Sequence, residues 1–211
     1  MENVEIIASS EGGSNFKKIP QGNYVARCYQ MILLGTFEET FEGKTRTLTK
    51  VRLVWETPTE TAVFVEDKGE QPFSVSKDFT LSLDEKANLR KCLDSWRGKA
   101  FTEDEAKKFN IAKLVGVPCM LNVIHTEKNG KTYVNIAAVS PMPKGFECPK
   151  QVNNSCVWSV LQPNWNVFKT FPEWLQRKIK ESKEFALLTE PTVTTAVSSE
   201  QEVAQVDDLP F

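Results

Sequence analysis

Residues 44–55 read KTRTLTKVRLVW, and polar and apolar side chains alternate along them. Successive side chains of a β-strand point to opposite faces, so a period of two predicts a strand. One face, which we expect to pack into a core, holds Thr45, Thr47, Thr49, Val51, Leu53 and Trp55. The basic residues of the other face are Lys44, Arg46, Lys50 and Arg52, with no acidic residue among them. The stretch therefore predicts a strand with one buried face and one cationic face.

The sequence on both sides predicts four more strands. An aromatic and β-branched run at residues 23–34 predicts the strand before it, and residues 73–81 predict the strand after it. Residues 119–125 and 132–139 predict two further strands, joined by a tight turn. Asn129-Gly130 favours that turn because both residues tolerate a positive φ.

Helical spacing replaces the period of two between the third and fourth strands. Ser82 and Glu85 match a capping box, apolar residues follow at helical spacing, and Gly98 is suited to end the helix. Thr102 and Glu105 repeat the capping box before a second, shorter helix. Three strands, a helix and two strands are the element order of a five-stranded OB-fold barrel (β-β-β-α-β-β). We therefore expect a mainly β chain with helices, built on this barrel and not on an immunoglobulin-like sandwich, which needs about seven strands.

The remaining segments are expected to lie around this barrel. Residues 1–19 show no period and predict a flexible lead-in to an OB-fold domain at residues 20–144. Residues 145–186 hold many aromatic side chains and a helix opened by Pro172, and we expect this aromatic arm to pack on the barrel. Residues 187–211 are rich in Thr, Ser, Val, Glu and Gln, which predicts a disordered acidic tail.

Charge is distributed unevenly along the chain. The net charge is −2, but residues 187–211 hold five acidic and no basic side chains, so the rest carries 26 basic against 23 acidic groups. A mildly basic body is suited to binding a polyanion. No leader pattern or membrane-spanning apolar run is present, so we expect a cytoplasmic protein with no membrane partner.

The sequence offers little for catalysis. The five cysteines form no C-x-x-C pair, His125 is the single histidine, and carboxylates are not clustered as a metal-dependent nuclease would require. Gly43-Lys44-Thr45 and Gly130-Lys131-Thr132 resemble the end of a phosphate-binding loop, but Glu38 and His125 stand where its first glycine is needed. We expect no enzymatic activity, no cofactor and no metal, and we interpret both stretches as hairpin turns.

Binding of a single-stranded nucleic acid needs cations along the backbone and aromatic faces for the bases. The cationic strand supplies the cations, although Lys and Arg on a solvated face also protect a sheet from edge aggregation. Tyr29, Phe41 and Tyr133 are candidates for stacking, with burial in the core as the alternative for each. By parity Tyr29 shares a face with Arg27, which favours exposure. The expected DNA-binding residues are Arg27, Tyr29, Phe41, Lys44, Arg46, Lys50, Arg52, Lys131 and Tyr133.

The final residues, Val206-Asp207-Asp208-Leu209-Pro210-Phe211, join two acids to an apolar end. They closely resemble the acidic tip of bacterial single-stranded DNA-binding proteins. In such a tip a terminal Phe fills an apolar pocket on a partner while its carboxylate meets a basic residue. The resemblance implies that replication or recombination proteins bind Asp207, Asp208, Leu209, Pro210 and Phe211.

The stretches from Ser76 to Lys99 and from Gly116 to Val123 also resemble a widespread family of uncharacterised phage and prophage proteins, over residues 20–145. This resemblance implies a phage replication or recombination setting in the bacterial host cytosol. We therefore expect a protein that binds and protects single-stranded DNA with little sequence preference. The alternative is a protein-interaction adaptor whose OB-like barrel binds a polypeptide. Homo-oligomers are common in this functional class, but nothing in the periodicity fixes an oligomeric state.

Overall fold

The computed structural model describes residues 17–188, and the prediction of a mainly β chain is confirmed. The strands are β1 (Gly22–Phe41), β2 (Lys44–Val63), β3 (Glu70–Thr80), β4 (Pro118–Lys128), β5 (Lys131–Ser140) and β6 (Cys156–Ser159). The helices are α1 (Asn88–Arg97), α2 (Glu103–Lys108), α3 (Trp165–Phe168) and α4 (Glu173–Lys180). Three short 3-10 turns are η1 (Glu66–Lys68), η2 (Ile111–Leu114) and η3 (Phe185–Leu187).

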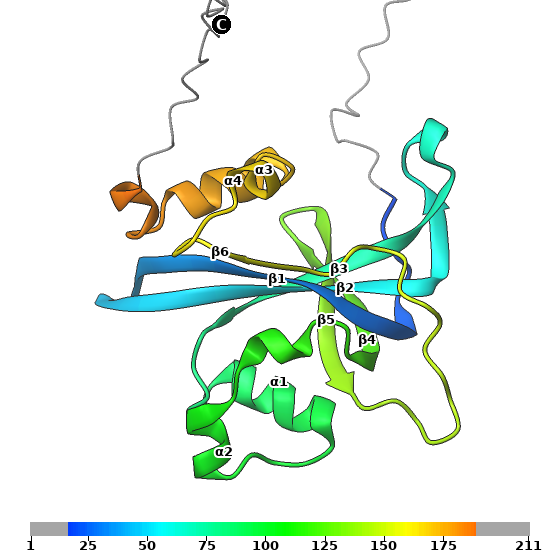
Figure 1. Ribbon diagram of the computed structural model, residues 1–211, viewed down its shortest axis with the longest axis horizontal. Coiled ribbons are helices and arrows are strands. Elements are labelled where there is room, and N and C mark those ends of the chain that lie inside the picture. The colour runs from blue at the N-terminus through cyan, green and yellow to red at the C-terminus, as the bar shows by residue number, and fades with distance from the viewer. Residues whose placement is uncertain (1–16, 189–211) are drawn as a thin grey trace, which may run out of the picture.

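The strands form one sheet in the order β3-β2-β1-β4-β5, with antiparallel neighbours, and α1 follows β3 in the chain (Figure 1). β1 is long enough to use two partners along one of its edges. Residues 22–27 pair with β4, and residues 30–33 pair in parallel with β6. The sequence did not predict β6, whose four residues are too few to show a period. β3 and β5 are left at the two ends of the sheet.

The main core lies between the sheet and α1. Val51, Leu53 and Trp55 are fully buried there, and the Trp55 ring packs on Trp96 with 5.7 Å between ring centroids. The predicted burial is thus observed for Val51, Leu53 and Trp55, but Thr45 and Thr47 of the same face are exposed and Val54 of the other face is buried. Ile19 joins the same core and is 3% exposed, which corrects the prediction that the flexible lead-in extends through residue 19.

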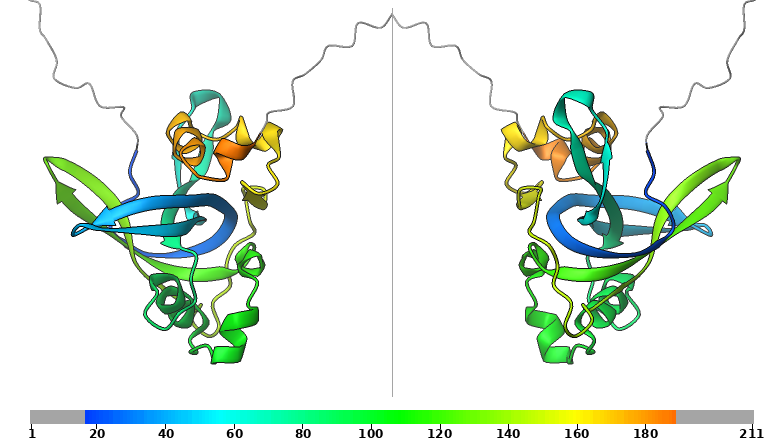
Figure 2. Two further views of the ribbon diagram at one scale, coloured as in Figure 1. Left: turned by 90° about the vertical axis from the view of Figure 1, so that its left-hand side faces the viewer. Right: turned by 90° about the vertical axis from the view of Figure 1, so that its right-hand side faces the viewer.

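A second core lies on the opposite face of the sheet, under the helices of the arm. Ile32 and Leu34 of β1 pack there against Trp158, Phe168 and Leu175. Figure 2 shows the arm, yellow to orange, on one side of the sheet and α1 with α2 on the other. Because side chains alternate along β1, that strand contributes to both cores.

Local capping signals had different outcomes. The Thr102 capping box is present, since Glu105 N–H donates to its hydroxyl (3.2 Å) and Thr102 N–H donates to the Glu105 carboxylate (2.9 Å). Gly98 ends α1 with φ 65°, as predicted. The predicted start of α1 at Ser82 is wrong, because the Ser82 hydroxyl accepts from the N–H of Asp84 and closes a turn there (3.2 Å). α1 instead begins at Asn88.

Two predicted segments lie largely outside the described residues. They are most of the lead-in, and the acidic tail from residue 189 with its tip Asp207–Phe211. Within residues 17–188, no helix is both long enough and apolar enough to cross a membrane.

Candidate nucleic-acid interface

The tip of the β1–β2 hairpin presents an aromatic ring beside two cations. Phe41 lies opposite Lys44 in the strand register, and the Phe41 side chain is 75% exposed. Arg46 lies on the same face, opposite Glu39, but Glu39 directs its carboxylate to Lys50. Within the described residues neither Lys44 nor Arg46 has an ion-pair partner, so both charges are available to a ligand.

The tip of the β4–β5 hairpin repeats this combination. Asn129 and Gly130 make the turn with φ of 52° and 70°, so the predicted Asn-Gly turn is confirmed. Lys128 and Lys131 lie directly opposite one another, and Tyr133, 48% exposed, follows on the same face. Like charges in opposite positions destabilise a hairpin, and a bound anion would relieve this repulsion. Sequence reasoning missed Lys128, although an Asn-Gly turn in two-residue register pairs it with Lys131.

The two hairpins are placed to contact an extended ligand. In the left panel of Figure 2 both point to the same side of the molecule, away from the arm and from α2. Figure 1 shows their tips separated along the long axis of the molecule. A chain that reached both tips would therefore run over the sheet surface instead of filling a small cavity.

The middle of β2 corrects the prediction of one continuous cationic face. The Arg52 guanidinium donates to both carboxylate oxygens of Asp78, at 2.6 and 2.9 Å, and lies 4.4 Å from the centre of the Trp174 ring. Lys178 adds a further bond to Asp78 (2.6 Å). Arg52 is thus neutralised and covered by α4, and Lys50 is paired with a carboxylate. The arm covers Arg52 because it packs on the apolar side chains of β1 on this face of the sheet.

Arg27 and Tyr29 are held by contacts within the protein. Arg27 donates to the carbonyl oxygens of Gly116 (2.8 Å) and Pro149 (3.1 Å), which fixes the segment after β5. The Tyr29 hydroxyl bonds with the Ser74 hydroxyl (3.2 Å), and burial chiefly raises the Tyr29 pKa. Tyr29 does share the face of Arg27, as parity predicts, since burial alternates from Tyr24 to Cys28 and both Arg27 and Tyr29 are half-buried. A register shift between Cys28 and Gln30 interrupts the alternation after this residue, so that Met31 and not Gln30 joins the main core.

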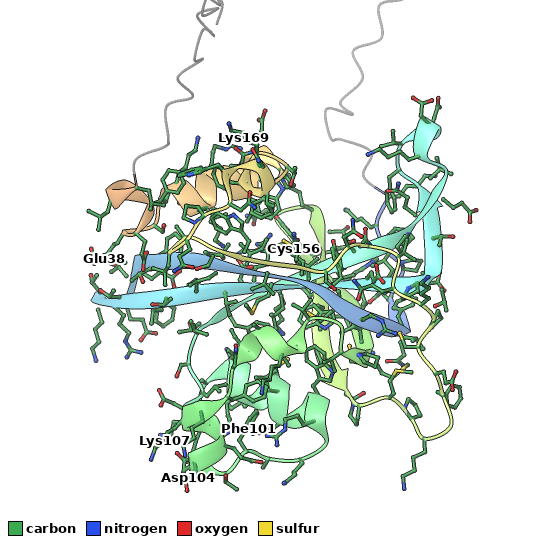
Figure 3. All side chains as sticks on the ribbon, viewed as in Figure 1. Glu38, Phe101, Asp104, Lys107, Cys156 and Lys169 are labelled. Atoms are coloured by element: carbon green, nitrogen blue, oxygen red, sulfur yellow. The ribbon has the colours of Figure 1, made fainter. Side chains whose placement is uncertain are left out.

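Ionic contacts also fix the arm to the β1–β2 hairpin. Glu184 accepts from the N–H of Thr36 (2.7 Å), and Lys183 pairs with Glu38 (2.6 Å), which is labelled at the hairpin end in Figure 3.

Burial raises the pKa of Asp78, but the bonds and charges of Arg52 and Lys178 outweigh that effect, so the net pKa is below its usual 3.8.

The contact of Asp78 with the arm should weaken in acid. A carboxyl group with a lowered folded-state pKa contributes stability above its unfolded value, and this is lost as pH falls through the folded value. We expect Asp78→Asn to lower the free energy of unfolding by about 2 kcal/mol at neutral pH, because two cations lose their partner. Denaturant titrations should show this difference shrinking below the usual pKa of 3.8. A difference that stays constant into strong acid would contradict this role of Asp78.

Groups suited to catalysis or metal binding are few in residues 17–188. No cluster of three or more His, Cys, Asp or Glu side chains there could hold a metal ion. Burial raises the pKa of Cys28 to about 12 and of Cys92 to about 11, so these thiols are protonated and unreactive near neutral pH. His125 Nε2 bonds with the carbonyl oxygen of Ile19 (2.8 Å).

Comparison with protein-family models and with curated proteins finds no match to this sequence.

Proposed function

We propose that this protein binds and protects single-stranded DNA through the tips of its β1–β2 and β4–β5 hairpins. The observation that carries the proposal is that each tip joins an exposed aromatic ring to two basic side chains without an ion-pair partner in residues 17–188. The proposed contacts are Phe41, Lys44, Arg46, Lys128, Lys131 and Tyr133. Cations bind phosphates and aromatic rings stack on bases, each stack contributing roughly 1–3 kcal/mol, and both contacts read little base identity.

We further propose that the sheet is an OB-type barrel. Its support is the strand order β3-β2-β1-β4-β5 with α1 between β3 and β4, which is the order of an OB barrel opened between its third and fifth strands. OB domains commonly bind oligonucleotides with the loops that follow their first and fourth strands. These loops are the two hairpin turns here. The proposed interface therefore uses the same two loops with which OB domains bind oligonucleotides.

The phage setting and the recruiting tail belong to the same proposal. Their support is the resemblance of the chain's final residues to the acidic tip of bacterial single-stranded DNA-binding proteins. In this proposal Asp207–Phe211 recruit a replication or recombination protein in the bacterial cytosol, while the hairpins hold the DNA.

Binding of fluorescently labelled oligo-dT, followed by anisotropy over a range of salt concentrations, tests the proposed function. We expect binding at low salt that weakens linearly on a plot of log affinity against log salt. Four basic contacts predict a slope of about −3 for a single strand. Absence of binding at low salt, or binding that salt leaves unchanged, would refute the proposal.

A further inference from the structure

A pocket lies at the edge of β3, beside the first half of β5. Lys77 Nζ of β3 donates to the carbonyl oxygen of Ile136 in β5 (2.8 Å), so a side chain joins the two strands at that point. The pocket lies before this contact in β3. It has a volume of about 470 Å³ and is lined by residues 71–76, by Val134 of β5 and by the segment that precedes β1. Small-molecule sites usually have volumes of about 300–1,000 Å³, so a group of the size of a nucleobase can enter.

The lining of this pocket combines aromatic rings with polar groups. The rings of Phe64 and Phe73 pack edge to face, with 5.1 Å between their centroids, and both side chains are half-buried. Gln71, also half-buried, adds an amide that can both donate and accept hydrogen bonds. A nucleobase has the matching character, because its flat face stacks on aromatic rings and its edge carries donors and acceptors. The lining is therefore suited to a base of any identity.

Two lysines connect the pocket to the proposed DNA-binding surface. Lys17 and Lys18 line the pocket at exposed positions, and none of the described residues that line it is acidic. Lys18 Nζ donates to the carbonyl oxygen of Thr132 (2.9 Å), which precedes Tyr133 at the tip of the β4–β5 hairpin. An ammonium group has three N–H donors, so Lys18 keeps two for a phosphate. A DNA strand bound at this tip therefore has the cations of the pocket as its next neighbours.

We infer that the pocket receives one unstacked base of the bound DNA, while Lys17 and Lys18 bind the phosphates beside that base. This inference rests on the proposed DNA binding and extends the interface beyond the β4–β5 hairpin tip. The base stacks on Phe73, and its polar edge faces Gln71. Because stacking and a reversible amide contact suit every base, the pocket adds affinity without adding sequence preference.

Photocrosslinking locates the base. Oligo-dT in which 5-iodouracil replaces some thymines is irradiated on the full-length protein, and the adducts are mapped by mass spectrometry. We expect adducts on Phe64 or Phe73 as well as on the hairpin tips. Phe73→Leu keeps an apolar side chain but removes the aromatic face, so it should weaken oligo-dT binding about tenfold. Phe185→Leu is the matched control, because it changes a half-buried ring of the arm, and it should leave the affinity unchanged.

The salt dependence of binding counts the phosphate contacts. The hairpin tips alone predict a slope of about −3, and two further contacts at the pocket predict about −4. Lys17→Gln with Lys18→Gln should return the slope to about −3. The matched pair Lys107→Gln with Lys108→Gln on α2 should leave it at about −4; Figure 3 labels Lys107 on the face opposite the arm.

The outcomes separate this inference from the proposed function. Absence of any oligo-dT binding refutes both. Binding through the hairpin tips, with no adduct on Phe64 or Phe73 or with a slope that the Lys17 and Lys18 variant leaves unchanged, overturns the base pocket alone. Equal affinities of Phe73→Leu and Phe185→Leu also overturn it.

Discussion

Replacement of Lys44, Arg46, Lys128 and Lys131 by Glu in one variant should lower oligo-dT affinity at least about 1,000-fold at low salt. Four phosphate contacts are lost and four repulsive charges are introduced at the places where the strand must pass. The four side chains are exposed and have no ion-pair partner within residues 17–188. The free energy of unfolding should therefore change by less than about 1 kcal/mol. Anisotropy and denaturant titration of the same preparation measure both quantities.

A control with the same charge change separates local contacts from the overall field. Lys99, Lys107, Lys108 and Lys113 are exposed and lie in or beside α2, on the other side of the sheet from the arm. Their replacement by Glu gives the same net charge as the hairpin variant. We expect this control to weaken DNA binding less than about tenfold, by a long-range effect alone. Equal losses in the two variants would mean that the hairpin tips are not the interface.

Features that depend on neighbouring residues could be predicted from the sequence. The Asn129-Gly130 turn and the Thr102 capping box each use residues within a few positions of one another, and both are present. The alternation that buries Val51, Leu53 and Trp55 is likewise a local property of one strand.

Features that depend on distant residues could not be predicted. The period of two places Arg52 on a polar face. Its exposure and its ion pairing, however, depend on Trp174 and Lys178, more than a hundred residues later in the chain. Nothing in the strand pattern shows that α4 will cover that position. The two register shifts in β1, after Cys28 and after Leu33, could not be predicted either, and each changes which face the following side chains share.

The docking of the arm depends on the absence of a side chain at Gly35. This residue has φ +108°, and an added Cβ would lie 2.6 Å from Ser182 Oγ and also clash with Ser182 Cβ. Ser182 is itself 1% exposed, and the N–H of the next residue, Lys183, donates to the carbonyl oxygen of Thr36 (2.9 Å). The turn that contains Ser182 therefore has little room to move away from β1.

Gly35→Ala should consequently lower the free energy of unfolding by about 3 kcal/mol, through backbone strain together with overpacking against Ser182. Gly43→Ala is the matched control, because Gly43 has φ +74° but no atom within 4 Å of an added Cβ. Only the backbone effect remains at Gly43, so its cost should be about 1 kcal/mol. Denaturant titration measures the two free energies, and limited proteolysis of residues 145–188 reports whether the arm is released. Equal costs at the two glycines, with the arm equally protected, would show that contact with Ser182 does not hold the arm on the sheet.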